Sequence, residues 1–140
     1  MELIYNKFKE ELDTEMTFDE FQILVLIYPV FLVAIADGAF DNDEKEFVKE
    51  ILLNFLHPLY NDEINDEQYE NLVENYLTDL AFLNENKARY EDDFLRALSS
   101  FDLEIKNSIL ELLTDVANAS EGLSEEEFKI IESIKVNYLS

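Results

Sequence analysis

The chain carries one pattern twice, as Ala34-Ile35-Ala36-Asp37-Gly38-Ala39-Phe40-Asp41-Asn42-Asp43-Glu44 and as Ala117-Asn118-Ala119-Ser120-Glu121-Gly122-Leu123-Ser124-Glu125-Glu126-Glu127. Each copy has small residues, then an acidic residue and a glycine, then an apolar residue, a capping residue and a Glu three positions later. A capping residue followed three positions later by Glu is the signature of a capping box at a helix N-terminus. The sequence therefore predicts the same helix–turn–helix unit twice, 83 residues apart from Asp41 to Ser124.

Apolar residues recur at helical spacing along the rest of the chain, and no segment favours a strand. Further capping boxes are expected to begin helices at Thr17 and Asn65. No stretch rich in Pro, Gly or Ser divides the chain. We therefore expect an all-α bundle of about seven helices, in a single domain that covers residues 1–140.

Two helix ends and three tyrosines carry more specific expectations. The helix that begins at Thr17 is expected to run through Ala36, because the glycine that follows is the usual residue beyond a helix C-terminus. His57-Pro58 is expected to stop the next long helix, since the residue before proline avoids the α region. Helical spacing places Tyr69, Tyr76 and Tyr90 at the edge of the core, where we expect solvated hydroxyls.

The composition limits the possible partners. The chain has 140 residues, with 33 Asp and Glu against 10 Lys and Arg, so its formal net charge is −23. This charge argues against direct binding to nucleic acid or to an anionic membrane surface, which both attract basic patches. Cations, basic proteins and basic peptides remain. The absence of Cys excludes thiol chemistry, and a single His57 argues against a His-rich zinc site.

The longest uncharged run and the first residues of the sequence do not indicate a membrane protein. The longest uncharged run, residues 21–36, is shorter than the roughly 20 apolar residues that span a bilayer, and Pro29 interrupts it. Met1-Glu2-Leu3 does not open with the basic region and early apolar stretch of a signal peptide. We expect a cytoplasmic protein that does not insert into membranes.

The two repeated turns are rich in carboxylates, which are the ligands that Ca²⁺ and Mg²⁺ prefer. The first turn holds Asp37, Asp41, Asp43 and Glu44, and the second holds Glu121, Glu125, Glu126 and Glu127. Each acid also has a structural interpretation: as an N-cap, as the return arm of a capping box, or as a solvated charge that complements the helix dipole. Capping explains one acid in each turn but not four.

A residue cannot easily act both as a cap and as a full metal ligand. Asp37 and Glu44 are therefore better candidates in the first turn than Asp41, and Glu121 and Glu127 are the candidates in the second. These five residues form the predicted metal site, for which we expect Ca²⁺ rather than Mg²⁺.

An EF-hand loop is the rival interpretation of the first turn. Asp37, Gly38, Phe40 and Glu44 fit the second half of such a loop, but the first ligand positions would then be Val33 and Ile35. Apolar side chains cannot ligate Ca²⁺, so we reject an EF-hand.

The first copy resembles the mark of the TerB-like family, Ala-x-Ala-Asp-Gly-x-(apolar)-(Ser/Asp)-x-x-Glu after an apolar helix. This family is known from tellurite-resistance operons and from membrane-anchored DnaJ-like co-chaperones. The resemblance covers residues 17–139 and includes a weaker repeat near the C-terminus. It implies an all-helical fold, divalent cation binding by an acidic surface, and a place in stress-response assemblies, including tellurite resistance and phage defence.

The second copy departs from the family pattern. Ser120 stands where the family has Asp, Glu121 stands at the glycine position, and the glycine follows at 122, whereas Glu127 matches. On this alignment Glu121 supplies a displaced carboxylate to the second half of the site.

The sequence does not indicate an enzyme. Enzyme signatures such as a phosphate loop, a nucleophile elbow or a zinc motif are absent from it, so we expect a non-enzymatic protein that binds basic protein partners. The alternative is an acidic immunity or inhibitor protein that caps a basic nuclease or mimics nucleic acid. The order of Glu20-Phe21, Ala36-Asp37, the acids around Glu44, and His57-Pro58 resembles colicin nuclease immunity proteins, which are shorter and lack the second repeat.

Overall fold

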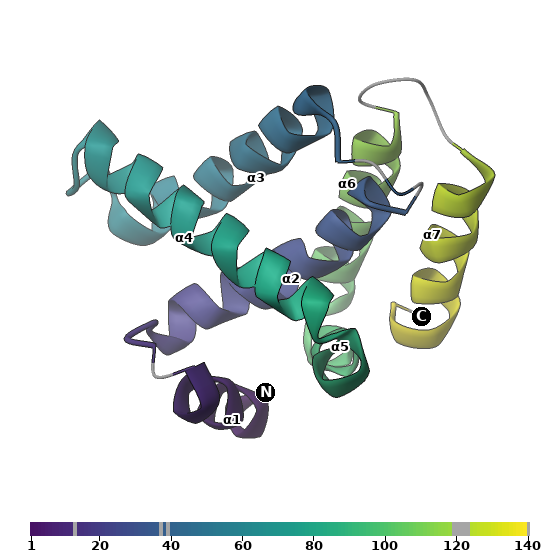
Figure 1. The fold of residues 1–140 in the computed structure, drawn as a ribbon, viewed down its shortest axis with the longest axis horizontal. Coiled ribbons are helices and arrows are strands. Elements are labelled where there is room, and N and C mark those ends of the chain that lie inside the picture. Colours follow the sequence, from purple (N-terminus) through teal and green to yellow (C-terminus); the bar gives the residue numbers. More distant parts are fainter. Residues whose placement is uncertain (13, 37, 39, 119–123, 140) are drawn as a thin grey trace.

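The computed structural model describes residues 1–12, 14–36, 38, 40–118 and 124–139, and shows helices packed around one central helix (Figure 1). The α-helices are α1 Glu2–Leu12, α2 Phe18–Ala34, α3 Asn42–Tyr60, α4 Asp66–Glu85, α5 Lys87–Ala97, α6 Leu103–Ala117 and α7 Glu125–Tyr138, with a short 3₁₀ helix η1 Leu98–Ser100 after α5. The described residues contain no strand. The predicted all-α class with about seven helices is confirmed.

All four predicted capping boxes are present and begin helices α2, α3, α4 and α7. In each box the N-cap side chain accepts a hydrogen bond from the backbone N–H three residues on, and that residue's side chain accepts one from the N-cap N–H. Asp102 caps α6 by accepting a 2.9 Å hydrogen bond from the Ile105 N–H. Local side-chain chemistry therefore determines where five of the helices begin.

Helix α2 lies at the centre of the molecule (Figure 1). Twelve of its seventeen residues are buried, and it contacts each of the other six α-helices. A helix that is apolar around its whole circumference is stable in water only when every side is covered. The other helices of the fold supply that cover. Within the described part of the chain, each helix is either too short or too polar to cross a membrane.

An aromatic cluster joins α1, α2 and α5 at one end of the core. The Phe94 ring centroid lies 5.5 Å from that of Phe21, 5.4 Å from that of Tyr28 and 5.8 Å from that of Phe8. These separations, with tilted and edge-to-face rings, fall in the range that aromatic pairs prefer. Phe94 is fully buried and lies at the middle of the cluster.

Two predicted helix ends are wrong. Helix α3 does not stop at His57-Pro58 but continues through Tyr60, and Asn61 then ends it in the left-handed conformation, with φ 50°. The extra turn packs Leu59 and Tyr60 against the core. This burial offsets the hydrogen bond that Pro58 cannot donate. Helix α2 ends at Ala34 rather than Ala36.

Some side chains also face differently from the prediction. Tyr76 and Tyr90 are fully buried, and their hydroxyls are not solvated. The Tyr76 hydroxyl donates to the Glu20 carbonyl oxygen at 2.8 Å, and that of Tyr90 donates to the Glu11 carboxylate. In the sequence, Leu123 and Phe128 fit a hydrophobic staple at the start of the last helix. Leu123 lies outside the described residues, and Phe128 is 50% exposed, so it does not form the predicted packing.

Replacing Phe94 with Ala should lower the free energy of unfolding by about 3–5 kcal/mol, because it opens a cavity in the middle of the aromatic cluster. Urea denaturation followed by circular dichroism measures the change. Phe128→Ala is the matched control, since the same atoms are removed from a half-exposed site, and its cost should stay below about 1 kcal/mol. Equal costs for the two variants would contradict the described core.

Candidate functional site

The candidate site lies at the first turns of α3 and α7, which directly follow the two repeated turns. In Figure 1 both first turns lie at the same end of the molecule as the last turn of α6. Three of the five predicted ligands, Asp41, Glu44 and Glu127, belong to these helix starts. The other two, Asp37 and Glu121, lie outside the described residues.

Asp41 is the N-cap of α3. Its Oδ1 accepts a 2.8 Å hydrogen bond from the Glu44 N–H, and Glu44 Oε1 accepts one of 3.4 Å from the Asp41 N–H. Asp41 is exposed, whereas Glu44 is only 2% exposed. One carboxylate oxygen of Asp41 thus acts as the acceptor of the helix cap. This capping role is the reason why Asp41 is a weaker candidate metal ligand than Asp37 and Glu44.

Ser124 and Glu127 repeat this arrangement at the start of α7. Ser124 Oγ accepts a 3.1 Å hydrogen bond from the Glu127 N–H, and Glu127 Oε1 accepts one of 3.1 Å from the Ser124 N–H. The second oxygen differs: Glu127 Oε2 is buried and has no hydrogen-bond partner among the described residues. A buried carboxylate oxygen without a donor is costly, because burial removes the water that would solvate it.

Glu44 and Glu127 differ in burial from Glu20, the third glutamate that closes a capping box. Among the described residues Glu44 and Glu127 are the two buried charged side chains, with 2% and 3% exposure. Glu20 closes the box of α2 while half-exposed, and its Oε2 accepts a 2.6 Å hydrogen bond from the Tyr60 hydroxyl. A capping box therefore does not require a buried carboxylate. The burial of Glu44 and Glu127 is an additional property of the repeated units.

The described residues alone do not complete a metal centre. They contain no group of three or more His, Cys, Asp or Glu side chains placed to hold an ion. Because Asp37 and Glu121 fall outside them, the predicted set of five is not tested as a whole. The neighbouring acids Asp43, Glu125 and Glu126 are exposed, and Glu125 pairs with Lys129 at 3.5 Å.

The structure also assembles a polar group at the end of α3 that the sequence analysis did not single out. His57 Nδ1 lies 2.7 Å from Asp62 Oδ1, and the His57 and Tyr69 ring centroids are 4.2 Å apart. Asn61 and Asp62 both have positive φ. This left-handed pair turns the chain back, so that Asp62 reaches His57. The group is largely exposed and joins the end of α3 to the start of α4.

Comparison with known protein families, with curated proteins and with solved structures found no match to this chain. The resemblance to the TerB-like family therefore stays a prediction. What the geometry itself defines is an acidic all-α protein with two buried glutamates at equivalent helix starts.

In metal-free protein, Glu127→Gln should raise the free energy of unfolding by about 1 kcal/mol. The amide keeps the acceptor for the Ser124 N–H and removes a buried charge, which costs more than a buried neutral group. Glu20→Gln is the matched control and should lower stability by about 1 kcal/mol, since it weakens a charge-assisted bond from Tyr60. Urea denaturation in a chelator measures both. A loss of stability in both variants would mean that Glu127 acts as a cap alone.

Proposed function

We propose that this protein is a non-enzymatic, acidic helical domain that binds one divalent cation between its two helix–turn–helix units and docks basic protein partners. Ca²⁺ is the proposed ion in preference to Mg²⁺. The proposed setting is the cytoplasm. The proposed role is in a stress-response assembly, which the resemblance to the TerB-like family implies.

The observation that carries the cation proposal is the unpartnered Oε2 of Glu127. A hard cation is the ligand that best compensates a buried carboxylate oxygen without a donor. Ca²⁺ accepts six to eight oxygen ligands in flexible geometry and tolerates carbonyl and carboxylate ligands, whereas Mg²⁺ demands an octahedral arrangement and usually keeps several waters. A buried protein oxygen is therefore better suited to Ca²⁺.

The repeat supports a site shared by two units. Glu44 occupies the position in α3 that Glu127 occupies in α7, and both are buried. In the proposal these two glutamates supply the inner ligands, and Asp37 and Glu121 supply the turn ligands. Asp41 keeps its place as the N-cap of α3 and contributes charge.

The charge supports the docking part of the proposal. With 33 acidic and 10 basic residues, most carboxylates have no basic residue in the chain to pair with. Such a surface attracts basic proteins quickly, and the attraction weakens as salt rises. The same property supports the alternative, an acidic inhibitor that caps a basic nuclease. The two proposals differ in whether a metal ion changes binding.

Calorimetric titration of metal-stripped protein with Ca²⁺, in a background of Mg²⁺ at near-physiological salt, tests the cation site. We expect a stoichiometry near one, with micromolar or tighter affinity. Glu127→Gln and Glu44→Gln should each weaken Ca²⁺ binding at least about tenfold, because each removes a charged ligand. Glu20→Gln changes the same atoms in the capping box of α2 and should leave the affinity unchanged.

Weak heat that does not saturate would overturn the cation site, because it is the behaviour of ions that screen a polyanion. An equal loss of affinity in Glu20→Gln would also overturn it. Tight, salt-sensitive binding of a basic nuclease with no effect of metal would then favour the inhibitor. Saturable binding that only Glu44→Gln and Glu127→Gln weaken supports the site at the repeated helix starts.

A further inference from the structure

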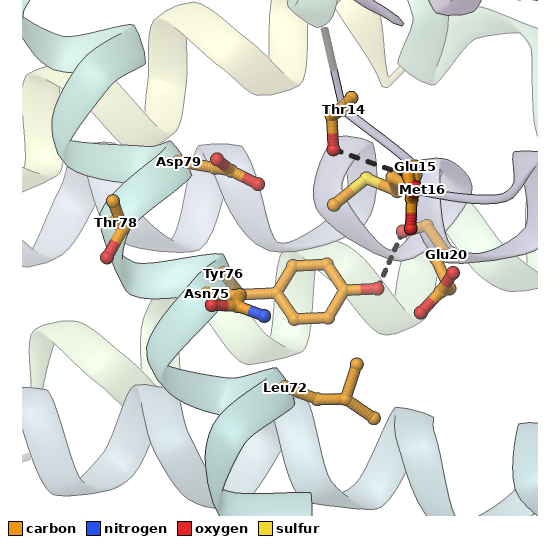
Figure 2. Close-up of a pocket in the computed structure, with 9 residues that line it drawn as sticks. All are labelled: Thr14, Glu15, Met16, Glu20, Leu72, Asn75, Tyr76, Thr78 and Asp79. Atoms are coloured by element: carbon orange, nitrogen blue, oxygen red, sulfur yellow. Dashed lines mark hydrogen bonds between the residues drawn. The ribbon is translucent and has the colours of Figure 1, made fainter. Parts of the chain in front are cut away.

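A cavity of about 460 Å³ opens between α4 and the segment that joins α1 to α2 (Figure 2). Its volume is in the range of about 300–1,000 Å³ that is usual for ligand sites. Thr14, Glu15 and Met16 form one side, and residues of α4 form the other. The cavity is separate from the helix starts that carry Glu44 and Glu127.

The cavity combines an apolar wall with a polar rim. Met16, Leu72 and the ring of Tyr76 supply the apolar part, and Tyr76 is held in place by its 2.8 Å hydrogen bond to the Glu20 carbonyl oxygen. Figure 2 shows the Asp79 carboxylate and the Tyr76 ring projecting from α4 toward the segment that carries Thr14 and Met16. No Lys, Arg or His is among the described residues that line the cavity.

Asp79 is the carboxylate available to a ligand. Burial raises the pKa of Asp79 from its ordinary 3.8 to about 6, and no hydrogen bond or ion pair to another described residue offsets this rise. Glu20, which also lines the cavity, is already engaged, because its Oε1 accepts from the Thr17 N–H at 2.9 Å and its Oε2 from the Tyr60 hydroxyl at 2.6 Å. Burial disfavours the charged form of Asp79, and a cation beside the carboxylate would stabilise that form.

We infer that this cavity binds an arginine side chain of a basic partner protein. The Asp79 carboxylate accepts the planar guanidinium through two parallel hydrogen bonds, and Glu15 adds charge at the rim. The methylene stem packs on Met16 and Leu72. The inference rests on the docking part of the proposed function and is independent of the cation site.

Two further hollows extend this surface along α4. One, of about 280 Å³, shares Leu72 and Asn75 with the cavity. The next, of about 450 Å³ between α3 and α4, shares Asn71 with the second hollow and is lined by four glutamates: Glu46, Glu50, Glu70 and Glu74. Its one lysine, Lys49, already pairs with two of them, at 3.8 and 3.4 Å. The surface of α4 beside the cavity is therefore also acidic, which favours a basic partner.

These glutamates lie on another side of α4 from the cavity. Glu70 and Asp79 are nine residues apart, and at 3.6 residues per turn their side chains project from opposite sides of the helix. One short segment of a partner therefore does not reach both, and the inference concerns a single arginine in the cavity.

The test uses the full chain in a chelator, so that a cation site has no effect on it. The probe is the peptide Ala-Ala-Ala-Arg-Ala-Ala-Ala-amide with a neutral fluorophore on its N-terminus, and anisotropy measures its affinity at low salt. Asp79→Asn should weaken binding at least about tenfold, the loss expected for a charge-assisted contact. Asp115→Asn changes the net charge equally at an exposed position of α6 and should change the affinity by less than about twofold.

Substitution of the arginine by citrulline, a neutral isostere, should weaken binding of the peptide to the unaltered protein. The same substitution should change binding to the Asp79→Asn variant little. Equal, small effects of Asp79→Asn and Asp115→Asn would overturn the cavity site while leaving diffuse docking intact. No binding of the peptide at low salt would overturn both. Displacement of the peptide by spermidine at equal concentration would overturn the assignment to a protein partner.

Discussion

The burial of α2 on every side is the constraint on which the rest of the structure depends. Residues from Phe21 to Ala34 present apolar surface around the whole helix, so no single neighbour can cover it. Helices from both ends of the chain therefore pack against it, and α1, α5 and α2 meet in the aromatic cluster around Phe94. Most of the acidic residues are left to the outer faces of these helices, which makes the surface anionic around an apolar centre.

The predictable part of the fold is the part that is set locally. A capping box needs only two side chains three residues apart, so Thr17, Asp41, Asn65 and Ser124 could all be recognised as helix starts. The end of α3 could not, because the burial of Leu59 and Tyr60 by other helices overrides the local preference of the residue before Pro58. The buried face of α3 was only partly predictable. Helical spacing favours Phe47, Ile51 and Phe55. Ile51 is buried, but Phe47 and Phe55 are only partly buried, and the rest of the buried apolar face is Val48, Leu52 and Leu56.

The candidate sites also combine features that local sequence predicts with features that depend on packing. The repeat placed Glu44 and Glu127 at equivalent helix starts. The sequence could not show that both are buried, or that one oxygen of Glu127 has no partner among the described residues, since burial depends on how other parts of the chain pack against these helix starts. The cavity lined by Glu15 and Asp79 had no sequence signal at all. Its two sides are more than fifty residues apart in the chain and meet only because α4 crosses α2.

The central place of α2 has a consequence for synthesis on the ribosome. The helix is complete once Ala34 is made, but α6, which covers part of it, is complete only at Ala117. At about 5–20 residues per second, this interval of 83 residues lasts roughly 4–17 s. During that time the most apolar segment of the protein lacks part of its cover, flanked by nascent helices rich in Glu and Asp. The nascent chain is then exposed to aggregation and to capture by chaperones, although the completed fold buries that helix.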